Sequence, residues 1–226
     1  MQAKWGMVGW VAAVALVLLL VTTNVRITAN SLWLYEQIFE HNHVPARTGI
    51  TMVELRHVGA TIQDYFSSDT EPLIVVAKIN GAQVRLFGAD EASHMAEVKQ
   101  LFVKTYRVQA LSALVLAVAI AATIYVHKRR AAGLVGSWLS RGSIIAAGAI
   151  AIIAVASLVA FQQVFLLFHY IGFPEGNFTF STQTDYLVRV FPNGFWSDIT
   201  FVIGAMTLIE AASLWTAIRF AKRLWQ

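Results

Sequence analysis

Two histidines beside long apolar segments are the residues of this sequence best suited to proton-transfer chemistry. His169 directly follows one apolar run, and His94 lies about fourteen residues before another. Histidine changes its charge near neutral pH, so one side chain can act first as a base and then as an acid. Spacing alone also allows each ring to be satisfied only by local hydrogen bonds. The pair is therefore a candidate catalytic pair if the chain folds so that the two rings meet.

The stretch around and after His169 is rich in aromatic rings. Nine of the chain's 27 aromatic residues lie between Phe168 and Trp196, and aromatic side chains gather where a membrane meets water. We interpret residues 166–198 as an active-site connector at a membrane surface. Polar side chains of this connector are candidates for binding substrate or a developing oxyanion: Asn177, Asp185, Tyr186 and Arg189.

Two further candidates carry weaker signals. His41 and His43 form an H-x-H pair, but further metal ligands at the usual spacing are lacking, so we predict no metal site. Glu210 lies in the middle of the last apolar stretch, where an ionisable residue is costly and suggests a function. The alternative is a protonated Glu210 that faces the other helices and bonds to Thr207 or Ser213.

The composition indicates an integral membrane protein. Hydrophobic residues make up 57% of the 226 residues, charged residues only 13%, and the mean hydropathy is +0.60, whereas soluble domains carry about 25% charged residues. The absence of cysteine excludes disulfides, thiolate metal sites and thiol redox catalysis. The sequence also lacks a Gly-rich phosphate loop, a G-x-S-x-G elbow and an H-E-x-x-H motif. No cofactor is predicted.

Four apolar stretches are long enough to span a bilayer: about 5–25, 108–126, 143–165 and 199–221. Eight basic residues and no acid flank them on one side, which predicts that both termini are cytoplasmic. The connector and residues 26–107 then lie on the extracytoplasmic side. The net charge of +4 reflects this topology rather than nucleic-acid binding. The first stretch lacks a small-x-small cleavage site, so we expect an uncleaved anchor.

Residues 26–107 combine helical and strand patterns. We predict a helix from Ser31 to about Asn42, a second after the capping box Thr51-x-x-Glu54, a β-hairpin at Asn80-Gly81, and a helix from Asp90 that runs into the second span. The expected fold class is a mainly α membrane protein of four transmembrane helices. An extracytoplasmic α+β cap, made of short helices plus the hairpin, joins spans one and two, and residues 1–226 form one membrane domain.

Motifs along nearly the whole chain resemble one family. They are Asn30…Tyr35, Thr48-Gly49-Ile50, His94-Met95-x-x-Val98-Lys99-x-Leu101-Phe102, and the run Phe168-His169…Phe173…Asn177…Phe180…Thr184-Asp185…Leu187-x-Arg189-x-Phe191-Pro192…Phe195-Trp196. On these motifs the chain resembles the small bacterial integral membrane proteins of the lipoprotein intramolecular transacylase family. The length, the four spans and the insert between spans one and two also fit.

The resemblance implies a definite reaction in the bacterial cytoplasmic membrane. The substrate is a diacylated lipoprotein, and the enzyme moves its sn-2 acyl chain onto the α-amine of the N-terminal cysteine, which leaves an N-acyl lyso-form. No coenzyme or metal is implied. The family's two functional histidines match His94 and His169. The roles of base and acid stay open between them, as does the choice of oxyanion donor, and Asp185 is a candidate for orienting a histidine.

Two alternatives come from other function classes. A small transporter that uses Glu210 would need more polar residues in its spans than the few present, such as Ser112, Thr123 and Ser157. A non-catalytic membrane sensor or assembly partner would tolerate the loss of both histidines. The oligomeric state is not predicted.

Overall fold

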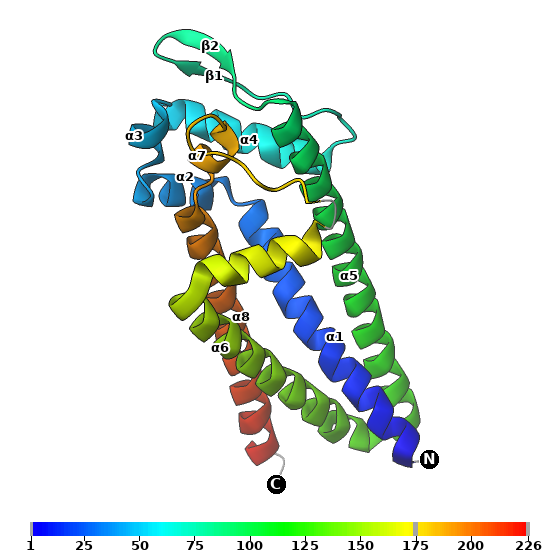
Figure 1. Ribbon diagram of the computed structural model, residues 1–226. Helices are drawn as coiled ribbons and strands as arrows, with labels where there is room; N and C mark the ends of the chain where they lie inside the picture. Colours follow the sequence, from blue (N-terminus) through cyan, green and yellow to red (C-terminus); the bar gives the residue numbers. More distant parts are fainter. Residues whose placement is uncertain (1, 174–175, 225–226) are drawn as a thin grey trace. The chain divides into compact units, whose positions relative to one another are not determined.

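Helices dominate the computed structural model of the chain, which describes residues 2–173 and 176–224 (Figure 1). The helices are α1 (Gln2–Ala29), α2 (Leu32–His41), α3 (Val44–Thr48), α4 (Met52–Ser67), α5 (Ala89–His127), η1 (Lys128–Arg130, a 3-10 helix), α6 (Ala131–Gly172), α7 (Tyr186–Val190) and α8 (Asn193–Leu224). The strands are β1 (Val76–Ile79) and β2 (Ala82–Arg85), which pair antiparallel. A mainly helical chain with one small hairpin is thus confirmed.

Three helical stretches of the described chain are long and apolar enough to cross a membrane. They are Trp5–Ala29, Ala89–Gly172 and Asn193–Ala221. The middle stretch comprises α5, η1 and α6, and it contains both middle spans of the sequence prediction. The count of four spans therefore stays a prediction.

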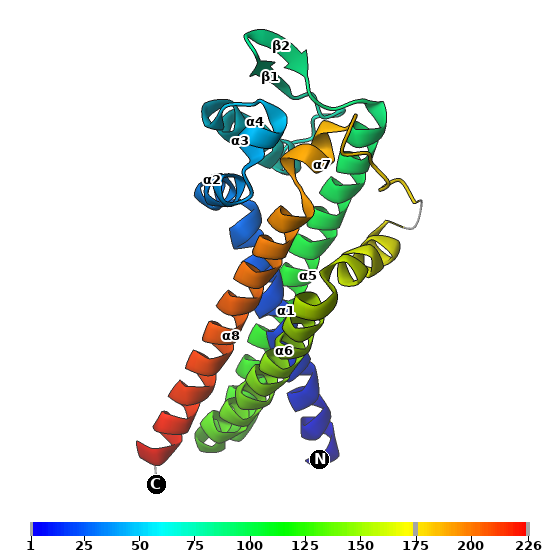
Figure 2. The same cartoon turned by 60° about the vertical axis from the view of Figure 1, so that its left-hand side comes forward.

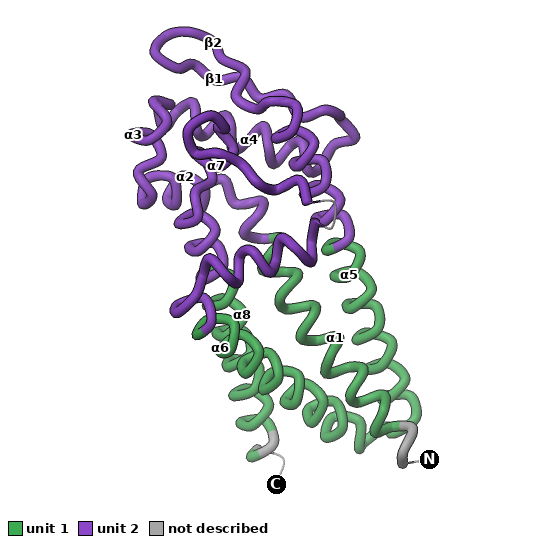
Figure 3. Tube along the Cα trace, in the orientation of Figure 1, with its two compact units in different colours: residues 1–26, 105–155, 202–226 green, residues 27–104, 156–201 purple. Residues whose placement is uncertain are grey.

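The chain divides into two compact units (Figure 3). Unit 1 comprises Met1–Arg26, Thr105–Val155 and Val202–Gln226, and unit 2 comprises Ile27–Lys104 and Ala156–Phe201. Each unit is assembled from segments far apart in the sequence. The single membrane domain of residues 1–226 stays a prediction.

Unit 2 contains the locally encoded elements that the sequence predicts. The Ser31 hydroxyl accepts from the backbone N–H of Leu34 at the start of α2, and the Thr51 hydroxyl accepts from that of Glu54 at the start of α4. The predicted return contact of the capping box is replaced, because the Glu54 carboxylate accepts from the backbone N–H of Lys78 at 3.0 Å. This bond joins α4 to the hairpin.

The hairpin turns at the predicted dipeptide. Asn80 and Gly81 have φ angles of 51° and 84°, the left-handed values that a tight primed turn requires. In both views the hairpin lies at one end of unit 2, next to α3 and α4 (Figures 1 and 2).

An aromatic core holds the short helices of unit 2 together. The rings of Phe39 on α2 and Phe195 on α8 stack with centroids 5.5 Å apart, and Tyr35 meets Phe195 edge-on at 5.4 Å. Phe39 and Phe195 are almost completely buried. The same core contains Leu187 and Val190 of α7, so it fixes α7 and the start of α8 next to α2.

Unit 1 packs through small residues and a few polar contacts. A Cβ on Gly9 of α1 would overlap the indole ring of Trp138 on α6. The Asn24 amide donates to the Thr207 hydroxyl at 3.0 Å and to the Glu210 carboxylate at 2.8 Å. The alternative to a functional Glu210 was a bond to Thr207 or Ser213, and the carboxylate instead accepts from Asn24 of another helix.

Candidate active site

The two candidate histidines lie next to each other in unit 2. His94 belongs to the second turn of α5 and His169 to the last turn of α6. Their ring centroids are 6.1 Å apart and their planes are inclined by only 16°. Both residues are buried, with 6% and 9% of their surfaces exposed. Residues 75 positions apart therefore form one pair of imidazoles.

A break in α6 creates the short helix that carries His169. Ala160 has φ −148° and ψ 49°, outside the helical range, so the break lies inside the predicted span 143–165, and residues 161–172 form a separate helical segment. On this segment Leu167 and Ile171 are exposed, whereas His169 faces inward. The segment is thus apolar on its outer face and carries the imidazole on its inner face.

Aromatic rings enclose both imidazoles. Phe173 and Phe180 lie 4.7 Å and 5.5 Å from the His94 ring, measured between centroids. Phe165 and Phe178 lie 4.2 Å and 5.3 Å from the His169 ring. These rings replace water around the histidines and disfavour their charged forms.

Burial lowers the pKa of both histidines. The pKa of His94 is lowered from 6.5 to about 4, because loss of hydration and, to a smaller extent, the nearby His169 disfavour the charged ring, while a hydrogen bond to the backbone of Asn177 opposes them. Burial likewise lowers the pKa of His169, while its hydrogen bond to the Phe165 carbonyl opposes this effect. The two histidines lie outside the four predicted membrane spans. Both imidazoles are therefore neutral at pH 7.

One hydrogen bond determines the tautomer of His169. Its Nδ1 lies 2.8 Å from the carbonyl oxygen of Phe165, one helical turn earlier. A carbonyl can only accept, so Nδ1 carries the proton and Nε2 carries a free lone pair. In the described part of the chain, Nδ1 of His94 is buried without a hydrogen-bond partner. The pair thus offers a basic nitrogen on one ring and an uncommitted nitrogen on the other.

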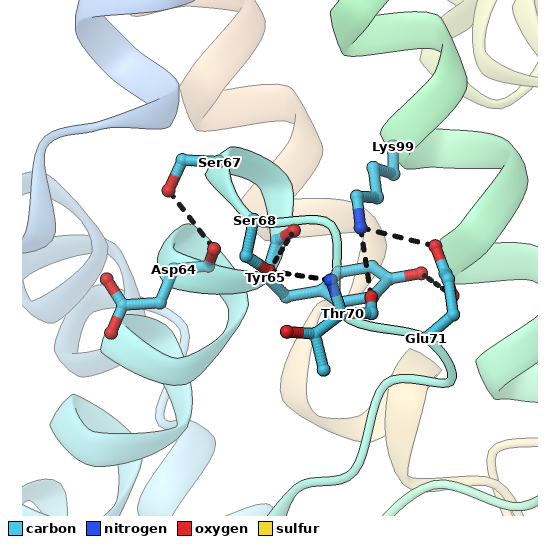
Figure 4. Close-up of polar contacts among 7 residues, drawn as sticks. All are labelled: Asp64, Tyr65, Ser67, Ser68, Thr70, Glu71 and Lys99. Carbon is cyan, nitrogen blue, oxygen red and sulfur yellow. Dashed lines mark hydrogen bonds and ion pairs between the residues drawn. The ribbon is translucent and has the colours of Figure 1, made fainter.

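Contacts of Lys99 tie α5 to the end of α4 and to the loop that follows it (Figure 4). The Lys99 ammonium donates to the Thr70 carbonyl at 3.0 Å and pairs with the Glu71 carboxylate at 3.3 Å. It also lies 4.2 Å from the centroid of the Tyr65 ring. The Tyr65 hydroxyl donates to Glu71 at 2.7 Å. Burial raises the pKa of Tyr65, and the hydrogen bond and charge of Glu71 raise it further.

The side chains of the other predicted site residues make their hydrogen bonds elsewhere, although the backbone of Asn177 bonds to the His94 ring. The Asn177 amide donates to the Asp90 carbonyl at 3.4 Å, so Asn177 lies beside the start of α5. The Asp185 carboxylate accepts from the Ser181 backbone N–H at 2.7 Å and from the Thr184 hydroxyl at 2.9 Å. These contacts do not support a role for Asp185 in orienting a histidine.

Tyr186 and Arg189 interact with each other. The guanidinium of Arg189 lies 4.4 Å from the centroid of the Tyr186 ring and donates to the Arg47 carbonyl at 3.2 Å. Among the described residues we find no hydrogen bond between either side chain and the two imidazoles. Their role as oxyanion donors stays a prediction.

The H-x-H pair has a different environment. His41 Nδ1 lies 2.8 Å from the Asp198 carboxylate, which also accepts from the Asn42 amide at 2.8 Å. A Cβ at Gly194 would overlap the Asn42 amide and would have to displace it from this bond. Among residues 2–173 and 176–224, no group of three or more histidine or acidic side chains is placed to hold a metal ion.

One buried acid was missed in the sequence. Glu91 lies three residues before His94 and is 5% exposed. Its carboxylate accepts from the backbone N–H groups of Gly88 and Leu187, both at 2.7 Å. The contact to Gly88, three residues earlier, is a helix-start signal that the sequence does contain. The contact to Leu187 is visible only in the fold.

Known proteins with similar sequence or structure agree on one family. The sequence profile of the lipoprotein intramolecular transacylase Lit matches residues 10–196, whereas no curated protein matches the chain. The structure of membrane-integral Lit from Bacillus cereus superposes with a TM-score of 0.82 at 17% identity, covering 99% of this chain and 100% of that one.

Two variants of the Bacillus cereus protein, with one histidine replaced by arginine or by alanine, give similar superpositions. The arginine variant has a TM-score of 0.77 at 17% identity and covers 100% of this chain and 96% of its own. The alanine variant has a TM-score of 0.79 at 16% identity, and the match covers 99% of this chain and 97% of the variant. These likenesses support the fold, and the profile match spans both imidazoles. The chain therefore belongs to the Lit family of lipoprotein intramolecular transacylases.

Proposed function

We propose that this protein transfers the sn-2 acyl chain of a diacylglyceryl-modified lipoprotein to the α-amine of its N-terminal cysteine. The product is an N-acylated lyso-form lipoprotein. The observation that carries the proposal is the buried pair His94–His169, with ring centroids 6.1 Å apart, in a chain of the Lit family. Both amine attack and departure of the sn-2 oxygen require proton transfer, and two imidazoles can divide these tasks.

His169 serves as the general base in this mechanism. Its Nε2 lone pair accepts a proton from the α-amine as the amine nitrogen attacks the sn-2 ester carbon. The resulting C–N bond and oxyanion belong to a tetrahedral intermediate, which collapses as the C–O bond to the glyceryl sn-2 oxygen breaks. That oxygen receives the proton taken from the amine, from His169 directly or through His94. The protons balance within a single turnover.

His94 is the second neutral imidazole of the proposed mechanism, because a pKa of about 4 keeps its ring uncharged at pH 7. Its N–H donates to the backbone carbonyl of Asn177, so the buried Nδ1 carries a lone pair that can relay a proton to the sn-2 oxygen. Donors aimed at the developing oxyanion lower the barrier strongly in a site that excludes water. Asn177, beside the start of α5, is the candidate donor closest to this helix. The oxyanion roles of Tyr186 and Arg189 have less support from their contacts.

Substrate geometry provides the remaining acceleration. Donor ester and acceptor amine belong to one molecule, so holding them in reach of each other removes much of the entropic barrier. The mechanism requires neither a coenzyme nor a metal. It also requires no serine or cysteine nucleophile, and hence no acyl-enzyme.

We further propose that the reaction takes place at the extracytoplasmic surface of the bacterial cytoplasmic membrane. Four spans with both termini cytoplasmic are supported by the one-sided placement of eight basic residues. The exposed apolar face of residues 161–172, with Leu167 at 59% and Ile171 at 75%, suits contact with lipid chains. The cap of residues 26–107 and the connector then enclose the ester at headgroup depth.

Mass spectrometry of lipoprotein N-termini from bacterial cells that lack other N-acylating activity tests the proposal. Cells expressing the wild-type protein are expected to contain N-acyl lyso-form lipoproteins. Cells expressing His94→Ala or His169→Ala are expected to retain the diacyl form with a free amine. His57→Ala is the matched control, because His57 is exposed on α4 of the same unit.

Membrane levels of each variant are measured alongside. Unchanged diacyl lipoproteins with inserted wild-type protein would reject the proposed function. Product that persists in both histidine variants would favour a non-catalytic sensor or assembly partner acting on an endogenous enzyme.

A further inference from the structure

The buried acidic and basic side chains of the described chain all lie in one place. They are Glu91, His94 and His169, and the mechanism above uses only the two histidines. A buried carboxylate is expensive unless hydrogen bonds satisfy it. Glu91 meets this condition with one backbone N–H on each oxygen, both at 2.7 Å. Its presence one turn before His94 therefore calls for a role.

The two donors to Glu91 belong to two different helix starts. Gly88 precedes α5, and Leu187 lies in the first turn of α7. The first N–H groups of a helix have no partner within the helix and favour a negative charge nearby. One carboxylate thus caps the helix that carries His94 and also a helix 96 residues away in sequence.

The residue preceding α7 does not perform this capping. Asp185 occupies the N-cap position, but its side chain makes no cap hydrogen bond. Its carboxylate is instead engaged by Ser181 and Thr184. The first turn of α7 therefore relies on Glu91 for a side-chain acceptor. This carboxylate hydrogen-bonds α7 to α5, beside a core that also contains Met95 of α5 and Val190 of α7.

The segment held by this attachment encloses the catalytic pair. Between α6 and α7, Phe178 contacts the His169 ring and Phe180 contacts the His94 ring. Residues 176–185, which carry both rings, lead directly into α7. Releasing the first turn of α7 would loosen Phe180 and, with it, the wall of the site.

We propose that Glu91 is a positioning residue for the transacylation: it clamps the first turn of α7 to the first turn of α5 and so holds His94 against the aromatic wall. This inference rests on the proposed function. Glu91 touches no reacting atom. Its replacement should reduce the rate of the chemical step and the shielding of His94 without weakening the binding of the lipid chains.

The test uses purified full-length protein in micelles with a synthetic diacylglyceryl-cysteinyl lipopeptide as substrate. Glu91→Gln keeps the size and removes one of the two acceptors. Glu91→Asp keeps the charge but is one methylene shorter, so it can cap α5 and no longer reach Leu187. Both are expected to lower kcat about 10- to 100-fold, with KM within about threefold of wild type.

Glu54→Gln is the matched control. Glu54 also lies in the first turn of a helix, on α4, and accepts from a distant backbone N–H, that of Lys78, but it does not touch the histidine site. It is expected to retain wild-type kcat. Melting curves give the folded fraction of every variant, and rates are expressed per folded molecule.

A second measurement does not depend on activity. Diethyl pyrocarbonate modifies accessible imidazoles, and mass spectrometry gives its rate at His94. We expect several-fold faster modification in Glu91→Gln than in the wild type or Glu54→Gln. An inactive wild-type enzyme would reject the proposed function. The modification rate of His94 would even then show whether Glu91 holds α7 against α5. Wild-type kcat per folded molecule in Glu91→Asp, a rise in KM alone, or unchanged modification of His94 would overturn the inference.

Discussion

The two units of this chain are stabilised in different ways. In unit 2 the buried core is large and aromatic, and Phe39, Phe191 and Phe195 pack ring against ring. In unit 1 the buried cluster centres on Ala12, Ala119 and Trp138. Many of its larger apolar side chains, such as Leu111 at 60% and Ile152 at 73%, are exposed.

The surrounding solvent explains the difference. Burying a large ring removes it from water and stabilises a fold in an aqueous setting. Inside a bilayer lipid tails are as apolar as leucine, so large side chains gain little by turning inward. Helices there associate through small residues and a few hydrogen bonds. Unit 1 has the packing expected in lipid, and unit 2 has the packing expected next to water.

The largest expected effect concerns the aromatic core of unit 2. Phe195→Ala would leave a cavity where a ring with 1% exposure now packs between Phe39 and Tyr35. We expect the free energy of unfolding to fall by about 3–5 kcal/mol. Thermal unfolding in detergent measures this. The matched change in unit 1 is Leu111→Ala, at an exposed apolar residue, and a loss as large there would contradict the contrast between the units.

The buried histidine of unit 2 predicts a dependence of stability on pH. His94 has its pKa lowered from 6.5 to about 4 in the folded state, so between these values the unfolded chain binds a proton that the folded chain does not. The free energy of unfolding is therefore unaffected by this titration above pH 6.5 and decreases as the pH falls toward 4. The total loss attributable to His94 is roughly 3 kcal/mol.

Melting temperatures of the wild type and His94→Gln between pH 4 and 7.5 check this prediction. The wild type should lose more stability on acidification than the variant, which lacks the titrating ring. Parallel curves for the two proteins would show that His94 is not held neutral.

In unit 1 the corresponding test is to enlarge a small residue. Gly9→Val would place side-chain atoms where the indole of Trp138 lies, and we expect a loss of about 1–3 kcal/mol from overpacking. Gly6→Val on the same helix is the control, because a Cβ there meets nothing within 4 Å. Equal melting temperatures for the two variants would contradict the close contact of α1 with α6.

The smallest expected effect concerns the polar contact in unit 1. A double-mutant cycle of Asn24→Ala and Thr207→Ala isolates the hydrogen bond between the two side chains, which is 3.0 Å long. Hydrogen bonds between membrane helices are worth about 0.6 kcal/mol on average, because the competing state also finds partners. A coupling energy above about 2 kcal/mol would mean that this contact is stronger than the lipid setting predicts.

Features that depend on neighbouring residues could be predicted from the sequence. The turn at Asn80-Gly81 follows from the left-handed angles that these two residues tolerate. The start of α4 follows from the Thr51 hydroxyl, which reaches an N–H only three residues away. The candidate histidines could also be identified, from their type and from the motifs around them. None of these inferences needed to know which distant segments meet.

Only the tertiary structure decided which distant groups meet. The pairing of His94 with His169 depends on the break at Ala160, for which no proline or glycine gave a signal. The partner of Glu210 is an asparagine 186 residues away, and Glu91 caps a helix 96 residues away. Such contacts arise because buried polar groups must find hydrogen bonds wherever packing brings a donor. The sequence by itself therefore determined the reactive side chains and the local elements, and packing determined their partners.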